Sequence, residues 1–471
     1  MSEKGVLLAV SSLPGKYGVG DFSTEAFKFI NMLVRHGVNL WQILPLNPIG
    51  YGHSPYQPFS SYAFDEVYIS IEDLQKRGLV GKYTKVREKA KSDYELARSI
   101  KENAIWKAFE KYRKSPQNMA NLRKFITNHR YIGEYAEFIS LKELNNGVSW
   151  SEWKINKSDK KDDFEYLYFK HSFAQMILLD EWNKIRKYAN RHNIKIIGDV
   201  PFYVGYDSSD VYFHRESFLL DENYKPSCVA GVPPDYFSKD GQNWGNPIWN
   251  WDYLYNDDFK AIMDRLSFAS QIYDIVRLDH FRAFDSYWCI SPTCETAVDG
   301  EWRYPDGYRF FNRLFEKYPN INLIVEDLGD LRPEVLTLKD HFNLPGIREL
   351  EFTIWDDEFN NKCVERENQV YYTSTHDNET LLEWIHNLPK EDKNRLIERC
   401  DILKLEGKNL TEKLIRYAMN RKERMIIIPA QDLMNLNKTH RMNMPGFVNE
   451  TNWTFKLKGF NKISRAIHKF F

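Results

Sequence analysis

Short apolar runs recur along the chain, separated by longer stretches in which apolar residues return every three or four positions. The first segment shows this rhythm, with apolar runs at 6–10 and 40–44 and an amphipathic stretch between Ser23 and Gly37. Short apolar runs are typical of buried strands, and the spacing of the middle stretch is that of a helix. A strand, a helix and a second strand predict a βαβ unit and therefore a parallel sheet.

The same rhythm resumes near residue 190, and a polar residue closely follows each apolar run. The later runs lie at 194–197, 272–278, 321–325, 369–375 and 424–428. Four carboxylates follow them closely: Asp199, Asp279, Glu326 and Asp377. These side chains would line a crevice in an open doubly wound sheet, whereas they would converge on one face of a (β/α)8 barrel. Because the chain lacks a dinucleotide-binding fingerprint, we predict an α/β fold, a (β/α)8 TIM barrel with helical subdomain insertions.

Two segments interrupt the alternation of strands and helices. From about 72 to 170, Lys, Glu, Arg and Tyr dominate and apolar residues recur at helical spacing, which predicts a mainly helical insertion. From about 205 to 255 the chain is rich in Gly, Pro, Asn and aromatic residues, as a long loop would be. We therefore expect residues 1–471 to form a single barrel that carries two insertions.

Composition and charge exclude several classes of protein. The 65 Lys and Arg residues balance 66 Asp and Glu residues, so we expect neither nucleic acid nor a membrane as a partner. The apolar run near the N-terminus is too short for a signal peptide, and the sequence has no stretch of membrane-spanning length. The five cysteines form no CxxC or zinc pattern. These features predict a soluble, cytoplasmic protein with reduced thiols.

The densest group of charged residues lies at 277–282, directly after an apolar run. Arg277 and Asp279 are two positions apart, so on a strand their side chains project to the same face. A guanidinium beside a carboxylate holds that carboxylate ionised. This is the state that a nucleophile or an electrostatic stabiliser requires, although a purely structural ion pair at a strand end is the alternative.

Two kinds of chemistry fit a cluster of carboxylates. Such a cluster can hold Mg²⁺ or Ca²⁺, but the spacing matches no metal-binding loop and Arg277 already supplies a counter-charge, so we expect no metal. Retaining glycoside chemistry instead uses one ionised and one protonated carboxyl group, about 5–5.5 Å apart. Aromatic residues make up 15% of the chain, and several lie in loop-like segments such as 51–56 and 242–249. Exposed aromatic rings in such loops would suit stacking against sugars.

A series of ordered motifs between Gly5 and Trp453 carries a more specific resemblance. The motifs are SLPG at 12–15, SPYQ at 54–57, GDVP at 198–201, GVPPDYFS at 231–238, GQNWGNP at 241–247, RLDHFR at 277–282, EDLG at 326–329, THD at 375–377 and RMNMPG at 441–446. In this order they resemble the 4-α-glucanotransferases (amylomaltases or disproportionating enzymes) of glycoside hydrolase family 77. The resemblance is weak only in the helical insertion.

This resemblance implies the transfer of α-1,4-glucan segments from a donor maltodextrin to the 4-hydroxyl of an acceptor, by a retaining double displacement and without a cofactor. Asp279 would be the nucleophile, Glu326 the general acid and base, and Asp377 a stabiliser of the transition state. The substrate-binding residues that it implies are Tyr56, Asp199, Asp235, Gln242, Trp244, Arg277, His280, His376 and Asn443. For Asp199, hydrogen bonding within the site is an alternative to direct contact with substrate.

The same resemblance makes the segment from about 205 to 255 an active-site loop insertion. A lid at 231–247 that excludes water would favour transfer over hydrolysis. The expected partners are maltooligosaccharides and α-1,4-glucans, and the expected assembly is a monomer or a weak homo-oligomer. An α-1,4-glucan hydrolase and a non-catalytic glucan-binding protein remain as alternative functions.

Overall fold

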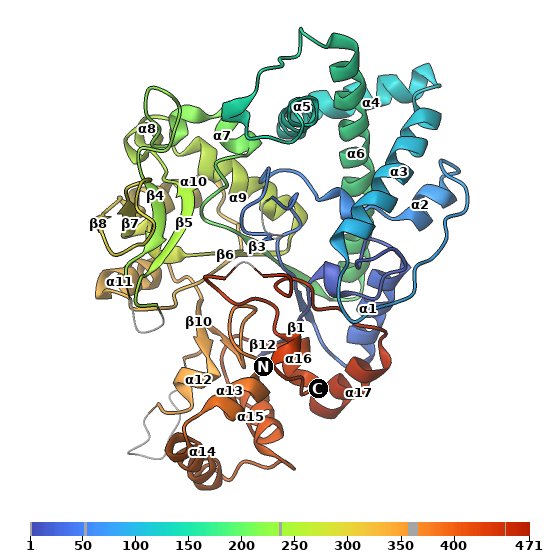
Figure 1. The fold of residues 1–471 in the computed structure, drawn as a ribbon. Helices are drawn as coiled ribbons and strands as arrows, with labels where there is room; N and C mark the ends of the chain where they lie inside the picture. The colour runs from blue at the N-terminus through green and yellow to red at the C-terminus, as the bar shows by residue number, and fades with distance from the viewer. Residues whose placement is uncertain (1, 51–53, 235–237, 357–365, 448) are drawn as a thin grey trace.

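Eight parallel strands form the centre of the molecule in the computed structural model, which describes residues 2–50, 54–234, 238–356, 366–447 and 449–471 (Figure 1). The strands are β1 (Glu3–Leu7), β2 (Leu40–Gln42), β3 (Lys195–Val200), β6 (Ile275–Leu278), β9 (Leu323–Val325), β10 (Gly346–Glu349), β11 (Gln369–Tyr372) and β12 (Met425–Pro429). They pair in the order β10-β11-β12-β1-β2-β3-β6-β9. At the remaining seam, the Val325 N–H donates to the Pro345 carbonyl at 2.9 Å. The sheet is thus a nearly closed barrel, and the predicted fold class is confirmed.

Alternate residues of each strand face the inside and the outside of this barrel. Side chains such as Leu7, Ile197 and Ile275 form one buried cluster inside it. Their neighbours, such as Val6 and Ile196, belong to a second cluster that includes the surrounding helices. Because both faces of the strands are buried, the strands read as continuous apolar runs in the sequence.

Strand β10 has no counterpart among the predicted strands. Its sequence, Gly346-Ile347-Arg348-Glu349, contains two charged residues, so it does not form an apolar run. Both side chains are buried, and Arg348 pairs with Glu423 (3.3 Å) and with Asp356, which lie outside the strand. Glu423 lies 75 residues from Arg348 in the sequence, so the pattern of β10 alone could not reveal this pairing.

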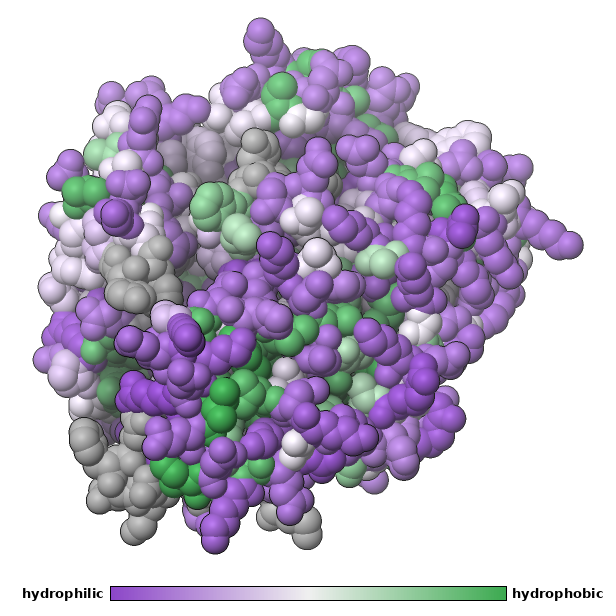
Figure 2. All heavy atoms as spheres, turned by 60° about the horizontal axis from the view of Figure 1, so that its bottom comes forward, coloured by the Kyte–Doolittle hydropathy of each residue, from purple (hydrophilic) through white to green (hydrophobic). Residues whose placement is uncertain are grey.

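Helices surround the barrel and fill the segments between its strands (Figure 1). Their bounds are α1 (Thr24–Arg35), α2 (Ile71–Lys76), α3 (Tyr94–Tyr112), α4 (Pro116–Asn128), α5 (Arg130–Leu144), α6 (Lys161–Arg191), α7 (Ser209–Phe213), α8 (Trp251–Asn256), α9 (Lys260–Ile272), α10 (Gly307–Lys317), α11 (Pro333–His341), α12 (Leu350–Thr353), α13 (Leu381–Asn387), α14 (Lys390–Ile402), α15 (Leu410–Met419), α16 (Ala430–Leu433) and α17 (Asn461–Phe470). None of those in the described residues is long and apolar enough to cross a membrane. Hydrophilic side chains cover most of the face shown in Figure 2, with apolar side chains in smaller groups among them.

The segment 72–170 contains most of α2, all of α3 to α5 and the first part of α6. The starts of its helices follow local sequence signals: the Asp93 side chain caps α3, and Ser115 caps α4 with Pro116 in the first turn. Helices α3 to α6 stand together to one side of the barrel, at the upper right of Figure 1.

A second sheet of four antiparallel strands lies beside the barrel, at the left of Figure 1. Its order is β5-β4-β7-β8, and the strands are β4 (Val229–Val232), β5 (Gln242–Pro247), β7 (Tyr287–Ile290) and β8 (Gly300–Arg303). Strands β4 and β5 belong to the segment 205–255, whereas β7 and β8 follow β6 of the barrel. Part of the predicted loop segment therefore has sheet structure, because later residues supply its pairing partners.

Candidate active site

Polar side chains gather where the barrel strands end. Asp199 is the fifth residue of β3, and Asp279, Glu326 and Glu349 stand at or directly after the ends of β6, β9 and β10. Asp377 follows β11 by a few residues. Since all these strands are parallel, their carboxyl ends meet on one face of the barrel. Asp199 also lies beside Arg277 in the register of β3 and β6.

Arg277 links two of these carboxylates at the base of the site. Its Nη1 lies 2.8 Å from both carboxylate oxygens of Asp199 and 2.8 Å from Oδ1 of Asp279. The Tyr56 hydroxyl donates to Asp199 Oδ2 at 2.8 Å. Burial raises the pKa of Asp199, and the charge of Arg277 opposes that rise. Asp199 is 1% exposed, whereas the Asp279 side chain is 27% exposed, so Asp279 is the carboxylate that a ligand can reach.

Glu326 is in a different electrostatic state from Asp279. Its Oε2 accepts a hydrogen bond from the His280 backbone N–H at 2.7 Å, which His280 can donate because its backbone turns into the left-handed region (φ 49°). Burial and the nearby charge of Asp279 raise the pKa of Glu326 to about 8. Burial also lowers the pKa of His280 to about 4, so its imidazole is neutral. The site therefore holds a protonated carboxyl group next to a carboxylate paired with arginine.

Asp377 is held at the rim of the site by the segment that follows η8 (Lys438–His440). The Asn443 side chain donates to Asp377 Oδ1 at 2.7 Å, and Arg441 donates to the Asp377 backbone carbonyl at 2.7 Å. Nε2 of His376 lies 3.3 Å from Asp377 Oδ2. The Asp377 side chain is 45% exposed, more than that of Asp279. Its carboxylate is fixed in orientation and open to a ligand.

Aromatic rings flank these carboxylates. The ring of Tyr56 stacks on that of His376, with centroids 5.1 Å apart and planes 3° apart. The ring of Trp453 lies 5.7 Å from that of Tyr56 and 6.0 Å from that of His376. Trp453 is absent from the predicted site residues, since nothing in its local sequence distinguishes it from a tryptophan of the core.

Strand β5 brings two further predicted residues to the same region. Trp244 approaches the His280 ring edge-on, with centroids 4.9 Å apart, and its indole N–H donates to Gln242 Oε1 at 3.2 Å. The Gln57 side chain donates to the Trp244 carbonyl at 3.0 Å and so ties β5 to the loop after β2. Asp235 lies outside the described residues.

Comparison with known proteins decides the family. The model of the family described as Glyco_hydro_77: 4-alpha-glucanotransferase matches residues 8–462. The chain belongs to this family. Its relatives include the 4-alpha-glucanotransferases of Aquifex aeolicus (37% identical over 96% of this chain and 95% of the relative) and Thermus thermophilus (36%, over 96% and 94%). The solved amylomaltase from Streptococcus agalactiae in complex with acarbose is 30% identical with a TM-score of 0.92, over 100% of this chain and 98% of that one.

These findings confirm the predicted family and activity: the chain is a 4-α-glucanotransferase that acts on α-1,4-glucans. The similarity extends over nearly the full length of each relative named above, so it includes every strand that supplies the site.

The 4-α-glucanotransferase site also contains acidic residues that the sequence analysis missed. Glu349 is 3% exposed, and its Oε2 lies 3.4 Å from the Asn378 amide nitrogen, which is also 2.9 Å from Glu351 Oε1. Burial, with the charges of Glu351 and Glu326, raises the pKa of Glu349 to about 8. The Thr375 N–H donates to Asn378 Oδ1 at 2.7 Å, so this group joins the end of β10 to the segment that carries Asp377. Recognition of β10 as a strand would have placed Glu349 in the site.

A cluster of carboxylates can also coordinate a metal ion. In the part of the chain that the structure describes, no group of three or more His, Cys, Asp or Glu side chains has the arrangement of a metal site. The carboxylates of the transferase are bound instead by donors from the protein, namely Arg277, Asn443 and the His280 N–H.

Proposed function

We propose that this 4-α-glucanotransferase works by a retaining double displacement in which Asp279 is the nucleophile and Glu326 is the general acid and base. One observation carries the assignment: a reachable carboxylate paired with Arg277 stands near Glu326, a half-buried carboxyl group whose pKa is raised to about 8. At neutral pH the first is suited to attack and the second to donate a proton.

In the first half of the reaction, a carboxylate oxygen of Asp279 attacks the anomeric carbon of the donor glucan. The glycosidic C–O bond breaks, and the departing sugar oxygen takes the proton of Glu326. The products are a glucosyl ester of Asp279 and a shortened glucan. Asp377, held by Asn443, would bind ring hydroxyls and stabilise the positive charge that develops on the sugar.

In the second half, the 4-hydroxyl of an acceptor sugar gives its proton to Glu326 and attacks the same anomeric carbon. The ester bond breaks and Asp279 becomes a carboxylate again. The charge of Asp279, which raises the pKa of Glu326, is absent while the ester exists. The pKa of Glu326 is therefore lower in the intermediate than in the free enzyme, so Glu326 stays ionised and can accept the proton of the acceptor hydroxyl.

The remaining predicted residues fall into two groups by their position in the site. Asp199 is almost completely buried behind Arg277, which favours a supporting role over direct contact with the glucan. We assign contact with maltooligosaccharides and α-1,4-glucans to Tyr56, Gln242, Trp244, His280, His376 and Asn443. Asp235, which lies outside the described residues, is assigned the same role from the sequence. The amylomaltase from Streptococcus agalactiae was solved in complex with acarbose, which supports binding of α-glucans.

We also propose that residues 1–471 act as a single catalytic barrel with a mainly helical insertion at about 72–170 and an active-site loop insertion at about 205–255. The contact of Trp244 with His280 supports the second assignment, because it brings this segment to the site. Assembly as a monomer or weak homo-oligomer and residence in the cytoplasm remain proposals from the sequence.

Maltotriose is the substrate that tests the proposed function. Incubation should give glucose and a ladder of longer maltodextrins at a constant number of reducing ends, and Asp279→Asn should lower the rate at least about 1,000-fold. An activated donor such as maltosyl fluoride should form an ester on Asp279 of the Glu326→Gln variant, visible as added mass on the peptide that contains Asp279. Rising reducing ends without longer products would instead mean hydrolysis, and an active Asp279→Asn enzyme would refute the assigned nucleophile.

A further inference from the structure

We propose that Arg265, which lies on α9 outside the carboxylate cluster, is a positioning residue that holds three active-site loops together. The loop after β2 carries Tyr56, the loop after β3 follows Asp199, and the loop after β5 follows the strand that contains Trp244. The inference rests on the function proposed above and adds a residue that does not touch the substrate.

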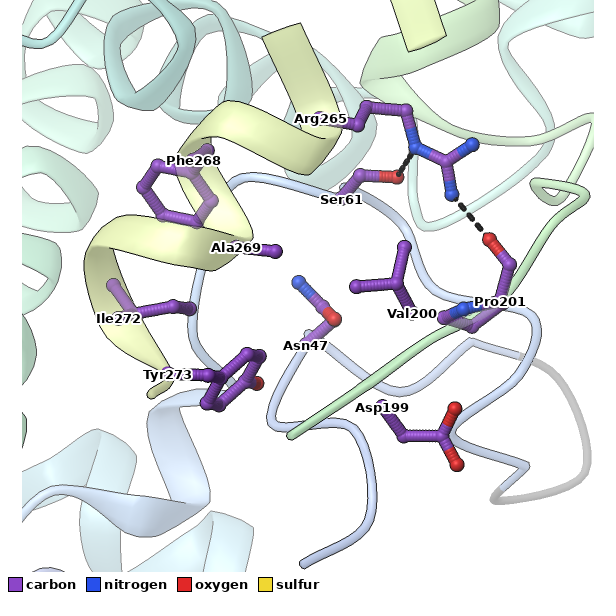
Figure 3. Close-up of a pocket in the computed structure, with 10 residues that line it drawn as sticks. All are labelled: Asn47, Ser61, Asp199, Val200, Pro201, Arg265, Phe268, Ala269, Ile272 and Tyr273. Atoms are coloured by element: carbon purple, nitrogen blue, oxygen red, sulfur yellow. Dashed lines mark hydrogen bonds between the residues drawn. The ribbon is translucent and has the colours of Figure 1, made fainter. Parts of the chain in front are cut away.

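The guanidinium of Arg265 donates to oxygens of two different loops. Its Nε lies 3.0 Å from Ser61 Oγ, its Nη1 is 3.0 Å from the Phe202 carbonyl, and its Nη2 is 2.6 Å from the Pro201 carbonyl. Figure 3 shows Arg265 reaching from α9 toward Ser61 and Pro201. The planar guanidinium carries five donors in fixed directions, so these bonds fix the two loops relative to each other.

The loop after β5 is also bound to the Phe202 carbonyl. The Trp249 indole N–H donates to the Phe202 carbonyl at 3.2 Å, and the Arg265 guanidinium lies 5.4 Å from the centre of the Trp249 ring. Trp249 follows the last residue of β5, Pro247, by two positions. A displacement of Phe202 would therefore be passed to β5, which carries Trp244.

Arg265 has an unusual environment for a buried cation. It is 5% exposed, and no carboxylate in the described ranges lies within ion-pair distance of it. Burial lowers its pKa, and the charge of Asp210 partly offsets this effect. Asp210 accepts a hydrogen bond from the Ser61 N–H at 2.9 Å, so it reinforces the same loop. An apolar side chain in place of Arg265 would avoid burial of charge, but it would leave the Ser61 hydroxyl and the Pro201 carbonyl without this donor and the Phe202 carbonyl with Trp249 alone.

Packing alone leaves room for movement behind Asp199. A cavity of about 20 Å³ lies between α9 and the end of β3, and Asn47, Asp199, Arg265 and Tyr273 are among its lining residues (Figure 3). This volume is close to that of one water molecule. Since side chains do not fill the space, the hydrogen bonds of Arg265 constrain residues 201 and 202, which follow the part of β3 that is paired with β6. Asp199 in turn shares Arg277 with the nucleophile.

The inference predicts a loss of transfer efficiency that exceeds any loss of stability. Arg265→Lys keeps the charge but removes the planar set of donors, and Arg265→Met removes both. Each variant should lower kcat/KM for maltotriose by about 10- to 100-fold, because small displacements of reacting groups have effects of this size. The share of intermediates captured by water should rise several-fold, since Trp244 and the acceptor side would no longer be held in place.

Arg186→Met is the matched control. Arg186 also reaches from an outer helix, α6, to a barrel connection, where its Nε lies 2.9 Å from Asp274 Oδ1 and it also donates to the Gln271 carbonyl. Asp274 directly precedes β6, at the end of the strand opposite to Asp279. Arg186→Met should lower the melting temperature without changing kcat/KM or the ratio of hydrolysis to transfer.

Guanidinium ion provides a second measurement. In Arg265→Ala, millimolar guanidinium chloride should restore part of the transfer rate, because the ion can donate to Ser61, Pro201 and Phe202 in the vacated space, whereas urea at equal concentration should not. A folded Arg265→Lys enzyme with the wild-type kcat/KM and the wild-type ratio of hydrolysis to transfer would overturn the inference. If Arg265→Met does not fold, the result for Arg265→Lys alone tests the inference. The proposed function would fail separately, through an active Asp279→Asn enzyme.

Discussion

Arg277 and its two carboxylate partners determine the charge distribution at the base of the site. The pairing of Arg277 with Asp279 follows from the sequence alone, because two residues at alternate positions of a strand face the same side. The sharing of the same guanidinium nitrogen with Asp199 does not, since it depends on the register of β3 against β6. The result is a carboxylate with a fixed counter-ion next to Glu326, which is half-buried and has a pKa raised to about 8.

The protonation of Glu326 predicts the pH dependence of transfer. Because its pKa is about 8 in the folded enzyme, Glu326 is protonated at neutral pH, and the proposed general acid is lost as pH rises through 8. The value of kcat/KM for maltotriose should therefore fall about tenfold per pH unit above roughly pH 8. With maltosyl fluoride as the donor, whose leaving group needs no proton, formation of the ester should lack this alkaline decline. The same decline with both donors would assign it to another group.

At the scale of secondary structure, strand β5 connects the small sheet to the active site. It is an edge strand of the small sheet, yet its Trp244 contacts His280 and is tied to the loop after β2 through Gln57. This arrangement closes one side of the site with an aromatic ring. A ring in this position can exclude water and support an acceptor sugar.

Trp244→Ala should therefore raise the ratio of hydrolysis to transfer by about tenfold while the enzyme stays folded, because water gains access to the ester. The ratio is measured as the increase in reducing ends for each molecule of glucose released from maltotriose. Trp288→Ala is a control in the same sheet, since the Trp288 indole donates to the Ala297 carbonyl instead of contacting His280. An unchanged ratio of hydrolysis to transfer in Trp244→Ala would mean that Trp244 on β5 does not exclude water from the site.

At the scale of the whole molecule, a buried histidine connects the helical region to the barrel. His171 on α6 lies 2.7 Å from Glu66 Oε1 through Nδ1 and 2.9 Å from Glu143 Oε2 through Nε2. Glu66 belongs to η3 (Glu66–Tyr68) after β2, and Glu143 belongs to α5. Burial alone would lower the pKa of His171, but the two carboxylates outweigh it and raise this pKa. Burial likewise opposes ionisation of Glu143, yet its hydrogen bond with His171 lowers its pKa to about 2.

These shifts give the stability of the enzyme a defined pH dependence. Because folding raises the pKa of His171, protonated His171 stabilises the folded state fully below about pH 6.5, and this stabilisation is lost as pH rises through the folded pKa. Because folding lowers the pKa of Glu143, ionised Glu143 stabilises the folded state above about pH 4.5, and this stabilisation is lost as pH falls toward 2. His171→Gln should cost about 2 kcal/mol near pH 5.5, the scale of hydrogen bonds to charged groups. The cost should shrink toward pH 9.

Urea unfolding of the wild type and His171→Gln at pH 5.5, 7 and 9 measures this difference. His386→Gln is the control, because His386 is exposed on α13 and its replacement should have a small effect that does not vary with pH. A cost of His171→Gln that is equal at all three pH values would mean that packing, and not the charge of His171, stabilises this connection.

The sequence by itself determined the family, the barrel and the order of the carboxylates along the chain. Most strands buried on both faces are apolar, so seven of the eight barrel strands are visible as apolar runs, and their polar ends mark the predicted functional face. Local patterns carry this information because each depends only on neighbouring residues.

The tertiary structure alone decided which polar groups meet and in what state. It revealed β10, in which the buried Arg348 pairs with the distant Glu423, and Glu349 at the end of this strand, and it placed Trp453 against Tyr56 and His376. It also set the pKa of Glu326, because burial and the approach of Asp279 act through space. Arg265 likewise donates to Ser61, which lies 204 residues away in the chain. Such effects depend on distances between remote residues, which no local pattern of hydrophobic and polar positions specifies.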